Sequence, residues 1–443
     1  MEKRLESLKI LDDLDKIDIQ DLAQKSKVKW AKEGDENTKF FHGILKKKRR
    51  VTGIGGILQD GRWEDDPVVV KSAFFNHFKS MFSPFVGPST WLGVDLPNRL
   101  SPELAHGLEV PFSTDEKKRQ FGTVEDIIGV VNEFFHSCTF PTGCNPSFIA
   151  LIPKINDPKL VSDFRPISLI GCQYKIIGKL LANRLSRVID GCVSREQTAF
   201  IRGRNILDGP MILNEVMWWY RQTHRKLMVF KVDFEKTYDS LRWDFLDLVL
   251  SELGFGSKWR RWIEGCLCNA RASVLVNGVP TDEFDICRGL RQGDPLAPFL
   301  FILAIEGLHA VIEKAKAVQL YTGAKVGSCA LPLSHLMYAD DVIFLGEWSL
   351  SNASNLISVL RCFFVMSGLK INVRKSNLIG RGVEPIESRE MAAVLGCGVA
   401  NMPFMYLGVP VGSNMSRIDS WCHNRQKFLH FRQRYYILTS QYK

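Results

Sequence analysis

Hydrophobic positions beyond the first quarter of the chain follow two kinds of spacing. Residues 124–135 and 174–190 carry apolar side chains three or four positions apart, which predicts amphipathic helices. Residues 295–316 are apolar almost throughout and predict a core helix, since Glu306 and His309 near their middle disfavour a membrane span. Residues 146–154 and 227–232 are short apolar runs, as expected of buried strands. The pattern predicts a folded mixture of helices and strands.

The expected helix at 174–190 has a clear division of residue types. Ile177, Leu181 and Leu185 recur on one side, which should face the core. Arg184 and Arg187 are expected elsewhere than on that side.

The first quarter of the chain is more polar. Residues 1–29 have helical spacing but are highly charged, so they predict a solvated helix. Residues 27–50 combine many cations with Trp30, Phe40 and Phe41, a mixture typical of nucleic-acid contact surfaces. A solvated basic face with a few core aromatics explains the same pattern. Residues 84–100 contain Pro and Gly breakers and are expected to form a linker.

Composition narrows the possible partners and surroundings. The chain has 443 residues, 45% of them hydrophobic, and a net charge of +10, which favours a polyanionic partner. The N-terminus is too charged for a signal peptide, and no run is suited to span a membrane. The 11 cysteines include no complete zinc motif, so they are expected to be reduced thiols of an intracellular protein.

Acidic residues interrupt two of the apolar segments. Asp340 and Asp341 are adjacent inside an expected hydrophobic hairpin at 336–347, and Asp233 ends the strand at 227–232. A β-turn would explain the adjacent pair, since Asp tolerates turn conformations. If folding brings the three carboxylates together, however, their mutual repulsion calls for a cation, and Mg²⁺ prefers such oxygen ligands.

Six blocks, found in order between residues 151 and 412, resemble reverse transcriptases of LINE-type non-LTR retrotransposons, as found in plant genomes. They read "DFRPISLI", "FKVDFEKTYDS", "RGLRQGDPLAPFLF", "YADD", "GLKINVRKS" and "YLGVPVG". The resemblance implies an α+β fold: a right-hand polymerase palm whose antiparallel sheet carries the carboxylates. It also implies RNA-directed DNA synthesis with two Mg²⁺ ions, or Mn²⁺, on an RNA template and a DNA primer with dNTPs. A nuclear location is implied as well, although no targeting signal is identified.

The resemblance also assigns roles to single residues. Asp233, Asp340 and Asp341 match the metal-binding triad, and Lys375 matches a lysine that protonates departing pyrophosphate. Tyr238 matches the aromatic ring beneath the incoming sugar, which excludes a 2′-hydroxyl. The remaining matches are expected to bind the nucleotide or its triphosphate: Lys154, Arg165, Gln292 and Gly293.

Departures from the family make activity of this chain an open question. Part of the fingers and most of the thumb are expected to be missing, so the chain should extend primers poorly. Two alternatives remain: a catalytically dead remnant that only binds nucleic acid, and a group II intron-type reverse transcriptase or maturase. The expected divisions are a basic helical lead-in at 1–83, a linker with truncated fingers at 84–124, the polymerase domain at 125–415 and a divergent tail at 416–443.

Overall fold

The computed structural model describes residues 53–85, 87, 93–113, 116, 125–141 and 143–412. The chain separates into two units. The first comprises Met1–His77, Ile149–Ile167 and Ser273–Asp282, and the second Phe78–Phe148, Ser168–Ala272 and Glu283–Lys443. The basic segment at 27–50 and the tail at 416–443 lie outside the described residues.

The first unit contains a small hairpin and the start of a helix. Strands β1 (Ile57–Gln59) and β2 (Arg62–Glu64) pair antiparallel, and helix α3 (Pro67–Phe82) follows. The ring of Phe74, on α3, meets that of Phe164 edge to face with centroids 5.4 Å apart. A sheet of order β4-β3-β6-β7, with β8 paired to β6, includes the two later segments of this unit.

The second unit is built on a five-stranded sheet of order β11-β12-β5-β13-β14. Its strands β11 (His335–Tyr338), β12 (Asp341–Glu347), β5 (Leu227–Val232) and β13 (Asn377–Arg381) pair antiparallel with their neighbours. The edge strand β14 (Gly398–Val399) is parallel to β13. The sheet is therefore predominantly antiparallel, as expected from the sequence.

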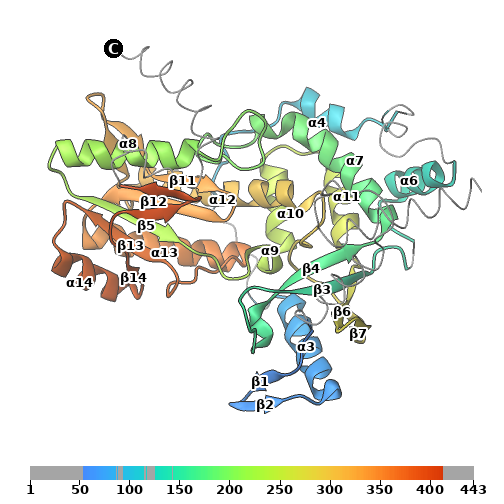
Figure 1. The fold of residues 1–443 in the computed structure, drawn as a ribbon. Coiled ribbons are helices and arrows are strands. Elements are labelled where there is room, and N and C mark those ends of the chain that lie inside the picture. The colour runs from blue at the N-terminus through green and yellow to red at the C-terminus, as the bar shows by residue number, and fades with distance from the viewer. Residues whose placement is uncertain are drawn as a thin grey trace, which may run out of the picture. The chain divides into compact units, whose positions relative to one another are not determined.

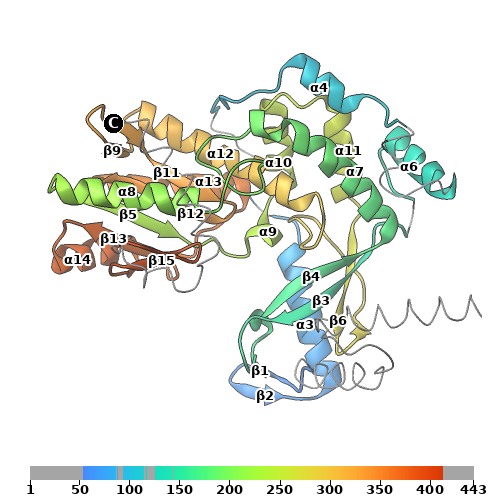
Figure 2. The same cartoon turned by 45° about the horizontal axis from the view of Figure 1, so that its top comes forward.

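Alternate residues of this sheet enter two different cores, as the two-residue period of a strand requires. Leu227 and Val229 of β5 pack with helix α8 (Asp208–Gln222). Met228 and Phe230 belong to the larger core formed with α12 (Ala297–Ala317) and α13 (Leu350–Ser367). Figures 1 and 2 show α8 crossing one face of the sheet. The central strand β5 is buried on both faces, which explains its unbroken apolar sequence.

The other described elements include the strands of the β4-β3-β6-β7 sheet and two separate antiparallel pairs, β9 with β10 and β15 with β16. The helices are α4 (Pro102–Glu109), α6 (Glu125–Ser137), α7 (Cys172–Val188), α9 (Thr237–Ser240), α10 (Trp243–Glu252), α11 (Ser257–Leu267), α14 (Pro385–Leu395) and the 3₁₀ turns η1 (Val161–Asp163) and η2 (Ile189–Gly191). The strands are β3 (Ser147–Pro153), β4 (Phe164–Ile170), β6 (Arg271–Val276), β7 (Val279–Pro280), β8 (Phe284–Asp285), β9 (Ala324–Val326), β10 (Leu331–Leu333), β15 (Phe404–Tyr406) and β16 (Val409–Val411).

The structure confirms the main elements that hydrophobic spacing predicts. Helices α6, α7 and α12 and strands β3 and β5 form where they are expected, with small shifts at their ends. The expected hairpin is also present, because Tyr338 pairs with Asp341 across its turn. In the segment expected to be a linker, Val94 and Leu96 are buried in the core of the second unit.

Arg184 is buried, although helical spacing places it away from the apolar side of α7. Its guanidinium lies 3.4 Å from the centroid of the Phe112 ring. It donates to the Leu108 carbonyl (2.9 Å) and forms an ion pair with Glu116 (2.9 Å). These partners come from a segment far from α7 in the sequence, so helical spacing alone could not reveal them.

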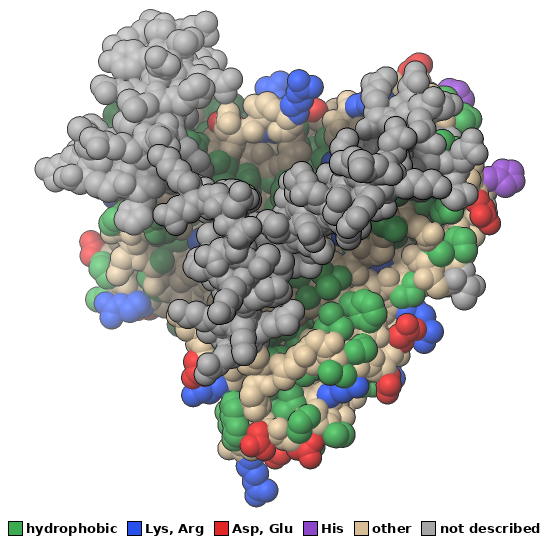
Figure 3. Space-filling view, turned by 45° about the vertical axis from the view of Figure 1, so that its right-hand side comes forward, with side chains coloured by type: hydrophobic (Ala, Val, Ile, Leu, Met, Phe, Trp, Pro, Cys, Tyr) green, Lys and Arg blue, Asp and Glu red, His purple; other side chains and the backbone are tan. Residues whose placement is uncertain are grey.

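Charged and apolar side chains are mixed on the described surface in Figure 3, with cations and anions interspersed. None of the described helices has both the length and the apolar character needed to cross a membrane. The ten cysteines within the described ranges are free thiols.

Candidate functional site

Strand pairing brings the three predicted metal ligands to one end of the central sheet. Val342 of β12 pairs with Val232 of β5, so the same register extended by one residue places Asp341 opposite Asp233. Asp340 lies in the two-residue turn between β11 and β12. Its carboxylate accepts a long hydrogen bond from the Thr237 hydroxyl (3.5 Å), just beyond β5. Carboxylates distant in sequence thus become neighbours.

The electrostatics of the three carboxylates show that they are crowded. Burial, followed by the charge of Asp340, raises the pKa of Asp341 above its usual value. Burial also raises the pKa of Asp233, where the Lys375 ammonium opposes the shift and Asp340 adds to it. The ionised forms of these carboxylates are therefore disfavoured, and a bound cation would stabilise them.

The backbone around Asp233 is held by the segment that carries Lys375. The amide of Asp233 donates to the Ser376 hydroxyl (3.2 Å), and its carbonyl accepts from the Asn372 amide (2.7 Å). Lys375 itself is exposed, one residue before Ser376. The structure therefore brings Lys375 to the same end of the sheet as Asp233.

Gln197 supports the turn that carries Asp340, a role that sequence analysis missed. Its side chain is fully buried, and its carbonyl oxygen accepts a hydrogen bond from the Ala339 amide (2.9 Å). Ala339 has a φ of 53°, a left-handed conformation that costs energy for a non-glycine residue. The sequence gives no signal for this role, because only the folded chain shows that Gln197 is buried and it has no recognisable spacing from the aspartates.

Tyr238 lies beside the aspartates, in the short helix α9. Its ring is half-buried against Phe301 of α12, with centroids 4.9 Å apart. Burial and the neighbouring Asp340 raise the pKa of Tyr238 to about 12, so its hydroxyl stays protonated. Its carbonyl accepts from the Leu290 amide (2.6 Å), while the Gly289 amide donates to Leu241 (2.7 Å).

Gly289 is required where this loop meets α9. Its φ is +84°, and a Cβ atom there would lie 2.5 Å from the carbonyl oxygen of Asp239. Any side chain would therefore push the 288–293 loop away from the segment that carries Tyr238.

Gln292 and Gly293 lie in a turn four residues or more before α12 begins at Ala297. Gly293 is exposed and has a φ of +104°, and the Gln292 carbonyl accepts from the Ser168 amide (2.8 Å). The positive φ explains why a glycine occupies position 293, and the nucleotide contact of this turn stays a prediction.

A buried polar network adjoins the turn at Gln292 and Gly293. The Tyr174 hydroxyl donates to Asp294 (2.5 Å), whose other oxygen accepts from the Leu296 amide (2.8 Å). The buried guanidinium of Arg291 lies 4.0 Å from the Tyr174 ring centroid and donates to the Cys266 carbonyl (3.0 Å). Asp294 was not singled out from the sequence, because only the folded chain shows that it is buried.

The two predicted triphosphate ligands lie in the first unit. Lys154 donates to the Ser162 carbonyl (2.8 Å), and its amide donates to Asp163 (2.8 Å). Arg165 is an exposed residue of β4. Their roles remain predictions.

His335, at the start of β11, is fully buried. Burial lowers its pKa well below the usual value, and the nearby His309 adds to the shift. Burial also lowers the pKa of His309.

Comparison with known proteins identifies relatives of the whole region. Residues 152–411 match the family described as reverse transcriptase (RNA-dependent DNA polymerase). The Xenopus laevis transposon TX1 uncharacterized 149 kDa protein is 25% identical over 77% of this chain and 28% of its own length. A retrovirus-related Pol polyprotein from a type-1 retrotransposable element R2 of Popillia japonica is 26% identical over 53% of this chain and 32% of its own length.

The chain spans about a third or less of these relatives' length. Among solved structures, apo telomerase from Candida tropicalis, truncated of its C-terminal domain, is 13% identical with a TM-score of 0.41. That similarity covers 58% of this chain and 55% of the telomerase chain.

Proposed function

Since the chain belongs to the reverse transcriptase family, we propose that it is the RNA-directed DNA polymerase of a LINE-type non-LTR retrotransposon. The observation that carries this proposal is the pairing of β5 with β12, which sets Asp233 beside Asp340 and Asp341. Relatives named as parts of transposable elements support the same class.

The three aspartates would hold Mg²⁺, or Mn²⁺ in its place. Their oxygens are the ligands that these hard cations prefer. The raised pKa values of Asp233 and Asp341 mean that their ionised forms are disfavoured, and a bound cation would stabilise those forms. When bound, two such ions lower the pKa of the primer hydroxyl and neutralise charge on the departing pyrophosphate.

The residues around the aspartates would orient the reactants. The primer 3′ oxygen forms a bond to the α-phosphorus of a dNTP, and the bond from that phosphorus to pyrophosphate breaks. Lys375, whose charge already acts on Asp233, would donate a proton to the departing pyrophosphate. The exposed Gln292–Gly293 turn would contact the nucleotide, and Lys154 and Arg165 would bind its triphosphate.

Tyr238 would select the sugar. Its ring is held against Phe301 at the level of Asp340, where it would leave no room for a 2′-hydroxyl. We expect Tyr238→Ala to lower discrimination against ribonucleotides by about 10–100-fold, the range typical of a small steric difference. The measurement is single-nucleotide incorporation of a dNTP and the matching rNTP.

Tyr238→Phe is the matched control, since it keeps the ring and should keep the discrimination. If Tyr238→Ala discriminates against ribonucleotides as strongly as Tyr238→Phe and the wild-type chain, Tyr238 has only a packing role.

The proposed partners are an RNA template, a DNA primer and dNTPs, which suit the net charge of +10. We propose a nuclear location, because an element of this class needs access to chromosomal DNA.

Primer extension tests the proposal directly. Residues 1–443 are incubated with an RNA template, an annealed DNA primer and dNTPs, with Mg²⁺ or with a chelator. We expect slow extension that requires the cation. Binding of the template–primer without any extension, in Mg²⁺ or Mn²⁺, would instead identify a catalytically dead remnant.

A further inference from the structure

A second group of side chains of the types that bind metals lies in the second unit, separate from the three aspartates. Across the described ranges, His309, Glu313 and His335 form the group whose ligand atoms all lie within 4.8 Å of one another. His309 and Glu313 are four residues apart on α12 and therefore share one face of the helix. His335 is the first residue of β11.

The two imidazoles already have nearly the separation of metal ligands. Nδ1 of His309 lies 3.0 Å from Nε2 of His335. Two nitrogens bound tetrahedrally to Zn²⁺ at about 2.0–2.1 Å are about 3.3–3.4 Å apart. An ion could therefore replace the hydrogen bond after the rings separate by a few tenths of an ångström.

Glu196 lies outside this group of three, but a change of its side-chain rotamer would bring a second carboxylate to the metal. An oxygen of Glu196 lies 3.9 Å from the same Nδ1 of His309. The backbone of Glu196 is tied to β11, since its carbonyl accepts from the Met337 amide (2.8 Å). Two imidazoles and two carboxylates make a four-ligand set of the kind that Zn²⁺ takes in proteins.

The surroundings fix the ring of His335. Its Nδ1 lies 2.9 Å from the Ser334 hydroxyl, which leaves Nε2 facing His309. Histidines that bind metals commonly use the other ring nitrogen in this way. Lys316 competes with a metal ion for Glu313, because its ammonium contacts both carboxylate oxygens of Glu313 at 2.7 and 2.9 Å.

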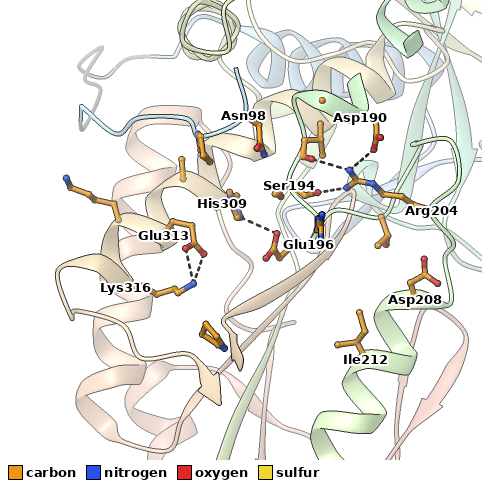
Figure 4. Close-up of a pocket in the computed structure, with 18 of the residues that line it drawn as sticks. Asn98, Asp190, Ser194, Glu196, Arg204, Asp208, Ile212, His309, Glu313 and Lys316 are labelled. Atoms are coloured by element: carbon orange, nitrogen blue, oxygen red, sulfur yellow. Dashed lines mark hydrogen bonds and ion pairs between the residues drawn. The ribbon is translucent and has the colours of Figure 1, made fainter. Parts of the chain in front are cut away.

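The group can be reached from solvent. His309, Glu313 and Glu196 line an open pocket of about 1850 Å³, while His335 lies behind them, fully buried. Figure 4 shows His309 and Glu196 pointing toward each other, and the carboxylate of Glu313 against Lys316.

We propose that His309, His335, Glu313 and Glu196 bind one Zn²⁺ ion. Imidazole nitrogen suits Zn²⁺, whereas Mg²⁺ prefers oxygen ligands alone. The ion would join α12 to β11, the strand that leads into the turn with Asp340. Its role would be structural, because all four positions around the metal are filled by the protein.

Zn²⁺ titration of the full chain, in excess Mg²⁺ and with a competing zinc-sensitive dye, tests the site. We expect one tight site, weakened at least about 10–100-fold in Glu313→Gln, since even outer-shell changes have that effect. Glu313 is partly exposed, so this variant should fold. Lys316→Met should bind Zn²⁺ more tightly, because it removes the competing ammonium. His136→Gln, at an exposed position on α6, should not change the affinity.

Binding of Co²⁺ in place of Zn²⁺ distinguishes this site from binding by the cysteine thiolates. An intense tetrahedral visible spectrum without a thiolate charge-transfer band is expected, and His309→Gln should abolish it. No tight site in the wild-type chain, or the same affinity in Glu313→Gln, would refute the proposal. Asp340→Asn should keep its Zn²⁺, so the result does not depend on polymerase activity.

Discussion

Asp340→Asn is expected to lower the rate of dNTP incorporation on the order of 1000-fold, the loss typical when a centre that stabilises transition-state charge is removed. Asn keeps the shape of Asp340 and can still accept from the Thr237 hydroxyl. It removes a negative charge that adds to the effect of burial in raising the pKa of both Asp233 and Asp341. Primer extension under single-turnover conditions measures the effect.

A stability measurement makes this prediction specific to the site. Because Asn relieves repulsion among the carboxylates, the unfolding temperature should be unchanged or higher while Mn²⁺ binding weakens. Asp282→Asn, at an exposed position, removes the same charge and should leave extension and Mn²⁺ binding as they are. Normal extension by Asp340→Asn would rule out the proposed role of Asp340.

Asp294→Ala is expected to destabilise the fold by about 2–6 kcal/mol, since it leaves two buried donors without their acceptor at about 1–3 kcal/mol each. Asp294 is nearly inaccessible, and the substitution removes a negative charge that interacts with the buried Arg291. It also removes the acceptor of the Tyr174 hydroxyl and of the Leu296 amide. Urea unfolding followed by tryptophan fluorescence, together with limited proteolysis, measures the loss.

Two milder variants divide this effect into its parts. Tyr174→Phe removes one hydrogen bond and should cost about 1.5–3 kcal/mol, the range for a bond to a charged group. Asp294→Asn keeps the shape and one acceptor and should lie between Tyr174→Phe and Asp294→Ala. If Asp294→Ala unfolds at the same urea concentration as the wild type, the network does not support the turn.

The sequence predicts those parts of the site that depend on local pattern. The run before Asp233 is apolar without interruption because β5 is buried on both faces. The hairpin around Asp340 and Asp341 follows from apolar residues on both sides of a turn. Which strands become neighbours came instead from resemblance to a family, since spacing along the chain carries no such information.

Residues whose role depends on distant partners could not be predicted. Arg184 is spaced away from the apolar side of its helix, but contacts with Leu108, Phe112 and Glu116 bury it. Gln197 and Asp294 resemble ordinary polar residues until folding encloses them. His309 and His335 have no sequence spacing that links them, and only their 3.0 Å approach indicates a shared ion.

The hydrogen bond from Ala339 to Gln197 has a consequence for the order of folding. The β11–β12 hairpin is local and can form within microseconds, as isolated hairpins do. Gln197 is 142 residues away in the sequence, so its contact requires a long loop to close and forms later. A partly folded chain would therefore contain the hairpin before Ala339 is held in its left-handed conformation. Asp340 reaches its final position only when the slowest of these contacts has formed.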